Sequence, residues 1–258
     1  MQPEKVPEVL RTSINFKIIA LFFVAAIGFQ IFLNFTEETE QIEEGIAFLS
    51  MSTPLIVAGG SAFIAMRYGL SKVFGKSYLI FAIGYFVLFL AEGTYYAYDV
   101  IYGIDPYPSI ADVFFFAFYI GVSLHMAINF RFFKTKIPLK YKALFIAIPV
   151  AIFSIYSYAS LIEFEEPDFD YYYGIIFVAG ASVILSLAAM GTIVFRGGVL
   201  GVTWMLLLIG ILIFTIGDVW YYWLEVVGEY SLLHPVNLLW YIPDGIVIYA
   251  LYKHSKAI

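Results

Sequence analysis

The feature that most restricts this fold is a succession of long apolar runs along nearly the whole chain. Lipid hydrocarbon offers the backbone no hydrogen-bond partner, so each run of about 20 apolar residues must form a helix of its own to cross a bilayer. The runs cover approximately residues 15–36, 46–68, 76–99, 109–132, 142–162, 171–194, 200–226 and 231–252. The sequence therefore predicts an all-α integral membrane protein with eight transmembrane helices.

The amino-acid composition is typical of an integral membrane protein. Apolar residues make up 62% of the sequence and charged residues 13%, whereas soluble domains average about 45–50% and about 25%. There is no cysteine, which excludes disulfides, zinc–thiolate sites, iron–sulfur clusters and thiol catalysis. We expect no cofactor.

The charged residues predict the orientation of the helices. All 14 Lys and Arg fall on one side of the predicted membrane, in the terminal segments, in alternate loops or at the adjoining ends of the runs, and the loops of the other side are acidic. The basic residues are Lys5, Arg11, Lys17, Arg67, Lys72, Lys76, Arg131, Lys134, Lys136, Lys140, Lys142, Arg196, Lys253 and Lys256. Because loops rich in Lys and Arg stay in the cytoplasm, we expect a cell-membrane protein with both termini cytoplasmic.

The chain also shows an internal repeat at an offset of 126 residues. Glycines, acids and a Tyr-Tyr pair match at this offset, which is harder to obtain by chance than a match of bulk hydrophobic residues. The matched positions are Gly75/Gly201, Gly84/Gly210, Glu92/Asp218, Tyr95-Tyr96/Tyr221-Tyr222 and Asp99/Glu225, and a one-residue gap then pairs Asp112 with Asn237. The pattern predicts two tandem four-helix repeats, related by a pseudo-twofold axis along the membrane normal.

This organisation divides the chain into five segments. A cytoplasmic segment (1–14) precedes the first repeat (15–132), a basic linker (133–141) leads to the second repeat (142–252), and a cytoplasmic tail (253–258) follows. The loop 131–142 carries five basic residues. It is the expected contact with a cytoplasmic signalling partner or with anionic lipid; we expect no nucleic acid partner.

Polar side chains inside the apolar runs mark a candidate site. Ionisable groups at membrane depth are costly, and they usually face the interior of the bundle or water. Glu92 and Asp99 lie seven residues apart on one helix face, and Asp218 and Glu225 repeat this spacing. The candidate ligand- or cation-binding residues are Glu92, Tyr95, Asp99, Asp112, Asp218, Tyr221, Glu225, Asn237 and Asp244. We place them in the outer half of the bilayer.

Two interpretations of these residues stay open. Several carboxylates with tyrosine hydroxyls suit a small ligand or a cation entering from outside, and oxygen ligands suit hard cations such as calcium; the identity of any metal is not predicted. Alternatively, the acids are structural, each capping a helix or bonding a tyrosine on a neighbouring helix. Asp112, which closely follows Ser109, suits a helix N-terminus.

The sequence contains no motif for catalysis. His-Glu-x-x-His, Gly-x-Ser-x-Gly and glycine-rich phosphate loops are all missing, and every lysine lies at or beyond the cytoplasmic end of a run, so none lies deep enough to hold retinal. His125 is a lone histidine within a run and is expected to be hydrogen-bonded structure, and His254 falls in the predicted tail. We expect a protein that is not an enzyme.

Two segments carry a resemblance to a known family. The first is EGTYYAYD at Glu92–Asp99, followed by PYPS at Pro106–Ser109 and ADVFFFAFY at Ala111–Tyr119. The second is GDVWYY at residues 217–222, followed by PVNLLWY at residues 235–241. Both resemble the multi-pass membrane sensor region found N-terminal to bacterial diguanylate cyclases and histidine kinases.

The resemblance implies a membrane sensor that carries the family's acids at Glu92, Asp112 and Asp218, while Asn237 departs from the usual Asp. Because no output domain follows in this sequence, such a sensor is expected to act through a partner. Three functions therefore remain as hypotheses. They are a non-enzymatic sensor or ligand-binding module, a secondary transporter or cation or proton conductor, and a scaffold subunit of a membrane complex.

Overall fold

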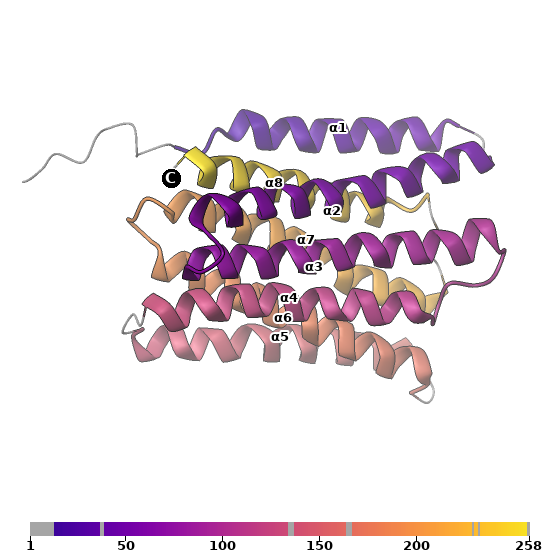
Figure 1. Cartoon of the computed structure of the whole chain (residues 1–258). Coiled ribbons are helices and arrows are strands. Elements are labelled where there is room, and N and C mark those ends of the chain that lie inside the picture. The colour runs from indigo at the N-terminus through magenta and orange to yellow at the C-terminus, as the bar shows by residue number, and fades with distance from the viewer. Residues whose placement is uncertain are drawn as a thin grey trace, which may run out of the picture.

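The computed structural model is an antiparallel bundle of eight long helices (Figure 1). It describes residues 13–36, 39–133, 137–163, 167–228, 230–231 and 233–256. The long helices are α1 (Phe16–Asn34), α2 (Glu40–Tyr68), α3 (Val73–Tyr96), α4 (Ile110–Phe133), α5 (Leu139–Glu163), α6 (Phe169–Val194), α7 (Gly201–Val227) and α8 (Leu238–Lys256). A π-helical turn, η2 (Ala97–Ile101), extends α3, and a 3-10 turn, η3 (Pro235–Asn237), precedes α8.

Helices α1 to α7 are each long and apolar enough to cross a membrane, which confirms a multi-pass membrane architecture for this part of the prediction. The eighth helix, α8, has the required length but is not among them. It carries Asp244, Lys253 and His254, and more than half of its residues are buried against other helices. Since a helix surrounded by protein does not face lipid, it tolerates these polar residues. Its crossing stays a prediction.

The core of the bundle is formed by two helix triplets. Helix α3 packs between α2 and α4, and α7 packs between α6 and α8. Contacts of α2 with α8 and of α4 with α6 join the triplets. The remaining two helices lie outside, α1 against α8 and α5 chiefly against α6 (Figure 1).

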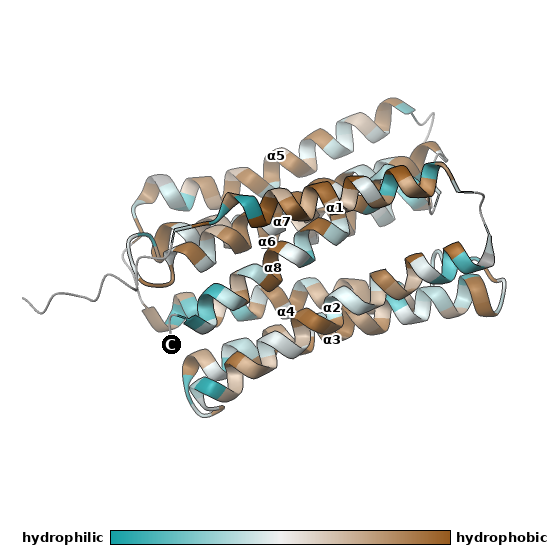
Figure 2. Cartoon of the chain, turned by 90° about the horizontal axis from the view of Figure 1, so that it is seen from above, coloured by the Kyte–Doolittle hydropathy of each residue, from teal (hydrophilic) through white to brown (hydrophobic). Residues whose placement is uncertain are grey.

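The outer helices present their side chains to the surroundings. Helix α5 has few buried residues, and exposed side chains such as Leu144, Ile146 and Ile155 lie along it. Helix α1 exposes Phe16, Leu21 and other large apolar side chains in the same way. Figure 2 shows hydrophobic residues along these helices, with hydrophilic ones concentrated toward the ends of the bundle. An apolar surface of this extent suits a lipid environment.

The bundle has a basic end and an acidic end. We call basic the end at which α1 begins and α8 finishes (Figure 1). Hydrogen bonds from Lys253 Nζ to Ser13 O (3.1 Å) and from Arg67 Nη1 to Ser255 O (2.9 Å) join α1, α2 and α8 there. Acidic residues at the opposite, acidic end include Glu44 in the first turns of α2, Asp105 in the loop after η2, and Glu163 at the end of α5.

The predicted ranges match the observed helices to within three residues, except that α2 begins six residues earlier than predicted, at Glu40, and α8 differs at both ends. The expected last run begins at residue 231, but the chain there is non-helical, and α8 begins at Leu238. Pro235 provides the physical reason, because its ring suits the first turn of a helix and its missing N–H does not suit the interior. The helix then continues to Lys256, so residues 253–256 are helical rather than a separate tail, and His254 is fully buried.

Helices α3 and α4 cross with their backbones close together. A Cβ atom added at Gly121 would lie 2.8 Å from the Cα atom of Gly84, so α4 has no room for a side chain at this point. The crossing places the acidic half of α3 beside that of α4. Gly59 on α2 has no neighbouring atom within 4 Å of an added Cβ.

We therefore expect Gly121→Ala to lower the free energy of unfolding by about 1–3 kcal/mol, because backbone must move to admit the methyl group. Gly59→Ala is the matched control and should be neutral or raise it by up to about 1 kcal/mol, since alanine favours a helix. Thermal unfolding of the purified protein in detergent measures both. Equal effects of the two substitutions would show that the α3–α4 contact is not tight.

Candidate functional site

A cavity of about 130 Å³ lies in the acidic half of the bundle. Its walls come from α2, α3 with η2, α4, α7, and α8 with η3, together with Tyr230 between α7 and η3. Both helix triplets therefore contribute to it. Toward the basic end, the next void, of about 10 Å³, has only Tyr85 and apolar residues in its wall.

Eight of the nine candidate residues predicted from the sequence line this cavity. They are Glu92, Tyr95, Asp99, Asp112, Asp218, Tyr221, Asn237 and Asp244. The ninth, Glu225, is not in the wall and is hydrogen-bonded to the Tyr221 hydroxyl. The structure thus brings residues from four separate segments to one place. Whether they bind a ligand stays a prediction.

Asp218 is held most firmly. Its Oδ2 atom accepts a hydrogen bond from the Tyr119 hydroxyl (2.6 Å), and its Oδ1 atom accepts one from Trp240 Nε1 (3.0 Å). The second bond depends on Gly217, because an added Cβ there would lie 2.9 Å from Leu239 Cβ and 3.3 Å from Trp240 Nε1. Asp218 therefore connects α4, α7 and α8 and is itself buried.

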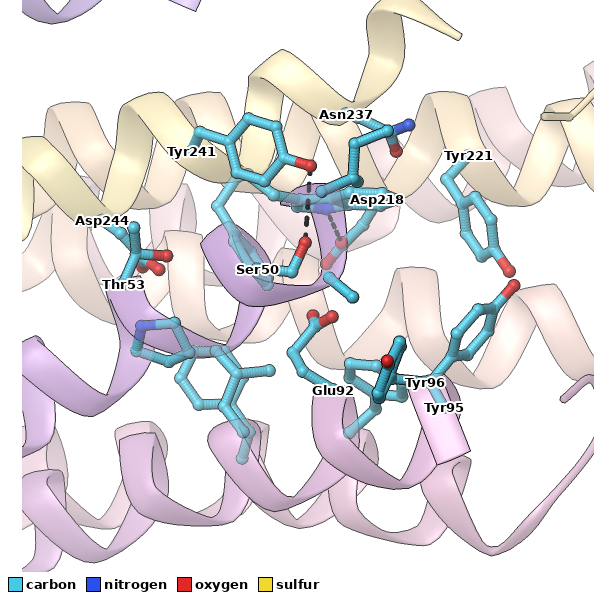
Figure 3. Close-up of a pocket in the computed structure, with 18 of the residues that line it drawn as sticks. Ser50, Thr53, Glu92, Tyr95, Tyr96, Asp218, Tyr221, Asn237, Tyr241 and Asp244 are labelled. Atoms are coloured by element: carbon cyan, nitrogen blue, oxygen red, sulfur yellow. Dashed lines mark hydrogen bonds between the residues drawn. The ribbon is translucent and has the colours of Figure 1, made fainter. Parts of the chain in front are cut away.

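Glu92 and Asp244 complete the deep part of the site. Figure 3 shows the Glu92 carboxylate directed into the cavity, below Ser50 and Asp218. No side chain or backbone group among the described residues donates a hydrogen bond to it. Asp244 is buried and is hydrogen-bonded to Thr53 on α2. Of the three carboxylates, Glu92 is the one left without a protein donor.

Asp112 has a structural role at the start of α4. Its Oδ2 atom accepts a hydrogen bond from the Ser109 N–H (2.7 Å), and Ser109 Oγ accepts one from the Ala111 N–H (3.1 Å). Such exchange of bonds across the first turn is a variant of a capping box. The structural interpretation therefore accounts for Asp112, although its carboxylate also borders the cavity.

Tyrosines form much of the remaining wall. Seven line the cavity: Tyr95, Tyr96, Tyr119, Tyr221, Tyr222, Tyr230 and Tyr241. The Tyr95 and Tyr221 hydroxyls face one another (Figure 3). Tyr230 lies outside the helices, and burial together with the neighbouring Tyr95 raises the pKa of its hydroxyl well above the usual value. It therefore remains a donor, and it bonds Asn237 Oδ1 (3.3 Å).

The lining is acidic without a basic counterpart. Six carboxylates border the cavity, and the described residues around it include no Lys, Arg or His. Across the described part of the chain, no three His, Cys, Asp or Glu side chains lie close enough together to hold a metal ion. The predicted use of these residues for a hard cation such as calcium therefore gains no support from their arrangement.

Several lining residues were not predicted as site residues. Ser50 and Thr53 come from α2, Tyr119 from α4, and Trp240 and Tyr241 from α8. Ser50 bonds the Tyr241 hydroxyl (3.4 Å). Ser50 and Thr53 are three residues apart on a largely apolar helix, a spacing that places them on one face and gives a signal for the site. The sequence gives no comparable signal that Trp240 belongs to the site, because tryptophan is common near membrane surfaces.

The basic half is closed by a second polar cluster, which we call the inner cluster: Tyr68, Ser77, Tyr78, His125, Asn129 and His254. His254 is hydrogen-bonded to the hydroxyls of Tyr68 (2.9 Å) and Tyr78 (2.8 Å). His125 bonds Ser77, as expected for a structural histidine. His125, Asn129 and His254 have no exposed surface, so the centre of this cluster is closed to the surroundings.

Comparisons with known proteins identify no relative. No family model matches the chain, no curated protein matches it, and no solved structure matches its fold. Its assignment therefore rests on the geometry of the cavity and on the charge pattern of the helices.

The hydrogen bonds to Asp218 predict a measurable coupling. Tyr119→Phe removes a donor from a buried carboxyl and should lower the free energy of unfolding by about 1–3 kcal/mol. Combined with Asp218→Asn, the loss should be smaller than the sum of the two single losses by at least about 0.5 kcal/mol, because the two groups share one bond. Denaturant unfolding of the four proteins in detergent measures this cycle.

Tyr158→Phe on α5 serves as the control, because the Tyr158 side chain is 71% exposed. It should leave stability unchanged. Strict additivity of Tyr119→Phe and Asp218→Asn would contradict the proposed linkage between α4 and α7.

Proposed function

We propose that this protein is a multi-pass membrane module that binds a small ligand from outside the cell and passes the binding event to a cytoplasmic partner. The observation that carries the proposal is the acidic cavity between the two helix triplets, into which Glu92 projects without a hydrogen-bond donor among the described residues. A carboxylate left in this way at membrane depth is costly unless something else supplies the missing interaction.

The acidic end faces outward in this proposal, and both termini are cytoplasmic. Described residues at the basic end include Arg67, Lys72, Arg131, Arg196 and Lys253, and loops rich in such residues are retained in the cytoplasm. The cavity then lies in the outer half of the membrane.

In this proposal the chain is a tandem repeat, in which α1–α4 correspond to α5–α8, and the cavity lies on the axis between these two halves. The pairing of α2 with α8 corresponds to the pairing of α6 with α4 under the sequence repeat. The Gly84–Gly121 contact likewise corresponds to Gly210, where an added Cβ would lie 3.7 Å from Ile246. Helices α1 and α5 do not correspond in their packing. The repeat is therefore supported by the inner helices only.

Binding is favoured over conduction by the inner cluster. Five of its side chains, Ser77, Tyr78, His125, Asn129 and His254, are buried, Trp204 stacks beside His125, and none of the described lining residues of the cavity belongs to this cluster. The transport alternative is favoured by one observation: Pro54 and Pro243 lie inside α2 and α8, and each adjoins a residue of the cavity wall. Both helices are continuous here, and helices interrupted at such residues surround many transporter sites.

Helix α8 is the proposed route from the cavity to the partner. It contributes Asp244 to the wall and ends at the basic end with Lys253 and Lys256. The predicted contact loop 131–142 lies at this end, and its residues 134–136 lie outside the described part of the chain. We propose that the partner, or anionic lipid, contacts these basic residues.

Cysteine labelling tests the orientation in a chain that has no native cysteine. We expect Ser231→Cys to react in intact cells with a membrane-impermeant, anionic methanethiosulfonate reagent, because Ser231 is exposed at the acidic end. Ser71→Cys, exposed at the basic end, should react only after permeabilisation. The reverse pattern would place the cavity toward the cytoplasm and would contradict the proposal.

Access to the cavity is tested with Ser50→Cys, since Ser50 lies in the cavity wall. A cationic, membrane-impermeant methanethiosulfonate reagent added outside should modify it in intact cells. Ser77→Cys is the control and should stay unreactive, because Ser77 is fully buried in the inner cluster. If the substituted Ser50 position reacts no faster than Ser77, no ligand reaches the cavity from outside.

Measuring ligand uptake into liposomes that contain the purified protein distinguishes a sensor from a transporter. Reconstituted protein that binds a ligand but does not move it into liposomes agrees with a binding module. Uptake that Asp244→Asn abolishes would instead establish the transport alternative.

A further inference from the structure

We propose that the ligand of the acidic cavity is a small organic ammonium ion. This inference deepens the proposed function and rests on it. Three independent features of the cavity carry it: uncompensated negative charge, a wall of aromatic rings, and an arrangement of oxygens that does not suit a metal ion.

The acidic residues of the wall, which have no basic partner among the described lining residues, favour a cationic ligand. Glu92, Asp218 and Asp244 border the cavity from α3, α7 and α8, and no Lys, Arg or His lies among its described lining residues. Neutral donors serve Asp218 and Asp244, from Tyr119, Trp240 and Thr53. Glu92 has none. A ligand that carries both a positive charge and N–H or C–H donors complements this carboxylate.

The oxygens are placed for one ammonium group rather than for a metal ion. Calcium requires 6–8 oxygen ligands converging at about 2.3–2.6 Å. Both oxygens of Asp218 already accept hydrogen bonds, and Asp112 is engaged at the start of α4. No group of three acidic or histidine side chains in the described chain converges on one point. An organic cation needs only one carboxylate and a surrounding apolar or aromatic wall.

Aromatic rings supply that wall. Tyr221 is its centre, with ring centroids 4.7 Å from Tyr230, 4.9 Å from Tyr222 and 5.3 Å from Trp240, all edge-on. Tyr95 faces Tyr221, and Tyr96 lies beside Glu92 (Figure 3). The faces of such rings attract cations, and the attraction grows when water is excluded. An anionic or strongly hydrated inorganic ligand gains nothing from them.

The volume restricts the size of the ligand. A void needs about 10–15 Å³ to admit one water molecule, so this cavity exceeds a single-water void roughly tenfold. It therefore suits a small amine or quaternary ammonium compound rather than a peptide or a lipid chain.

The test compares cations with uncharged molecules of the same shape. Choline is paired with 3,3-dimethylbutan-1-ol, in which carbon replaces the charged nitrogen, and butylammonium is paired with butan-1-ol. At about ten times the dissociation constant, a bound cation should raise the unfolding midpoint of the purified protein by about 3–6 °C. The uncharged partner should produce no shift.

Two variants locate the effect. Glu92→Gln should weaken binding of the cation about tenfold or more, because the charge-assisted contact is lost. Glu163→Gln, which removes the same charge from an exposed position on α5, should leave binding unchanged. If Glu92→Gln does not fold, Asp244→Asn replaces it, with the same expected loss of affinity.

These experiments distinguish failure of the ammonium-ion inference from failure of the broader proposal that the cavity binds a ligand. A cation-specific shift that Glu92→Gln abolishes supports the inference. Equal shifts from charged and uncharged partners, or no shift from either cation, overturn it. In that case labelling of Ser50→Cys from outside still decides whether the cavity receives some other ligand, so the broader proposal stands or falls separately.

Discussion

The two hydrogen bonds to Asp218 are the interaction on which the inner architecture depends. Tyr119 reaches it from α4 and Trp240 from α8, so one carboxylate on α7 fixes three helices relative to one another. In a bilayer, apolar contact between helices gives little net attraction, because lipid tails are equally apolar. Buried polar contacts and close packing at small residues then select which helices meet. Gly217 brings α7 against α8, and Gly84 with Gly121 brings α3 against α4.

Much of the helix layout is predictable from the sequence, because backbone in hydrocarbon has no alternative to helix. Seven predicted runs correspond to helices with the composition of a membrane span. The eighth was wrong at both ends, since Pro235 delays α8 and His254 is held inside the bundle by Tyr68 and Tyr78. Local composition marks Lys253 and His254 as a polar tail, and only the tertiary hydrogen bonds show otherwise.

The convergence of the acids was also predictable in part. Their depth follows from helix length, and the repeat relates Glu92 to Asp218, so a common level in the bundle could be expected. Which neighbours they would meet could not. Trp240 is an ordinary interfacial residue in the sequence, and it becomes an Asp218 partner only because α7 and α8 touch at Gly217. Glu225 lies seven residues after Asp218 on α7, yet it does not line the cavity. Two residues on the same face of a long helix can contact different neighbouring helices, so spacing alone does not place both in one site.

The two ends of the bundle treat buried polar groups differently, and this difference argues for a ligand at one of them. At the basic end, His254 has a tyrosine hydroxyl at each ring nitrogen, and the two buried atoms without a hydrogen-bond partner, His125 Nε2 and Asn129 Oδ1, belong to residues that line neither void. At the acidic end, Glu92 lacks a donor where there is room for one. A protein selected only for stability would fill that space with a hydroxyl or an apolar side chain. An acceptor that stays open beside a cavity is the feature that binding requires.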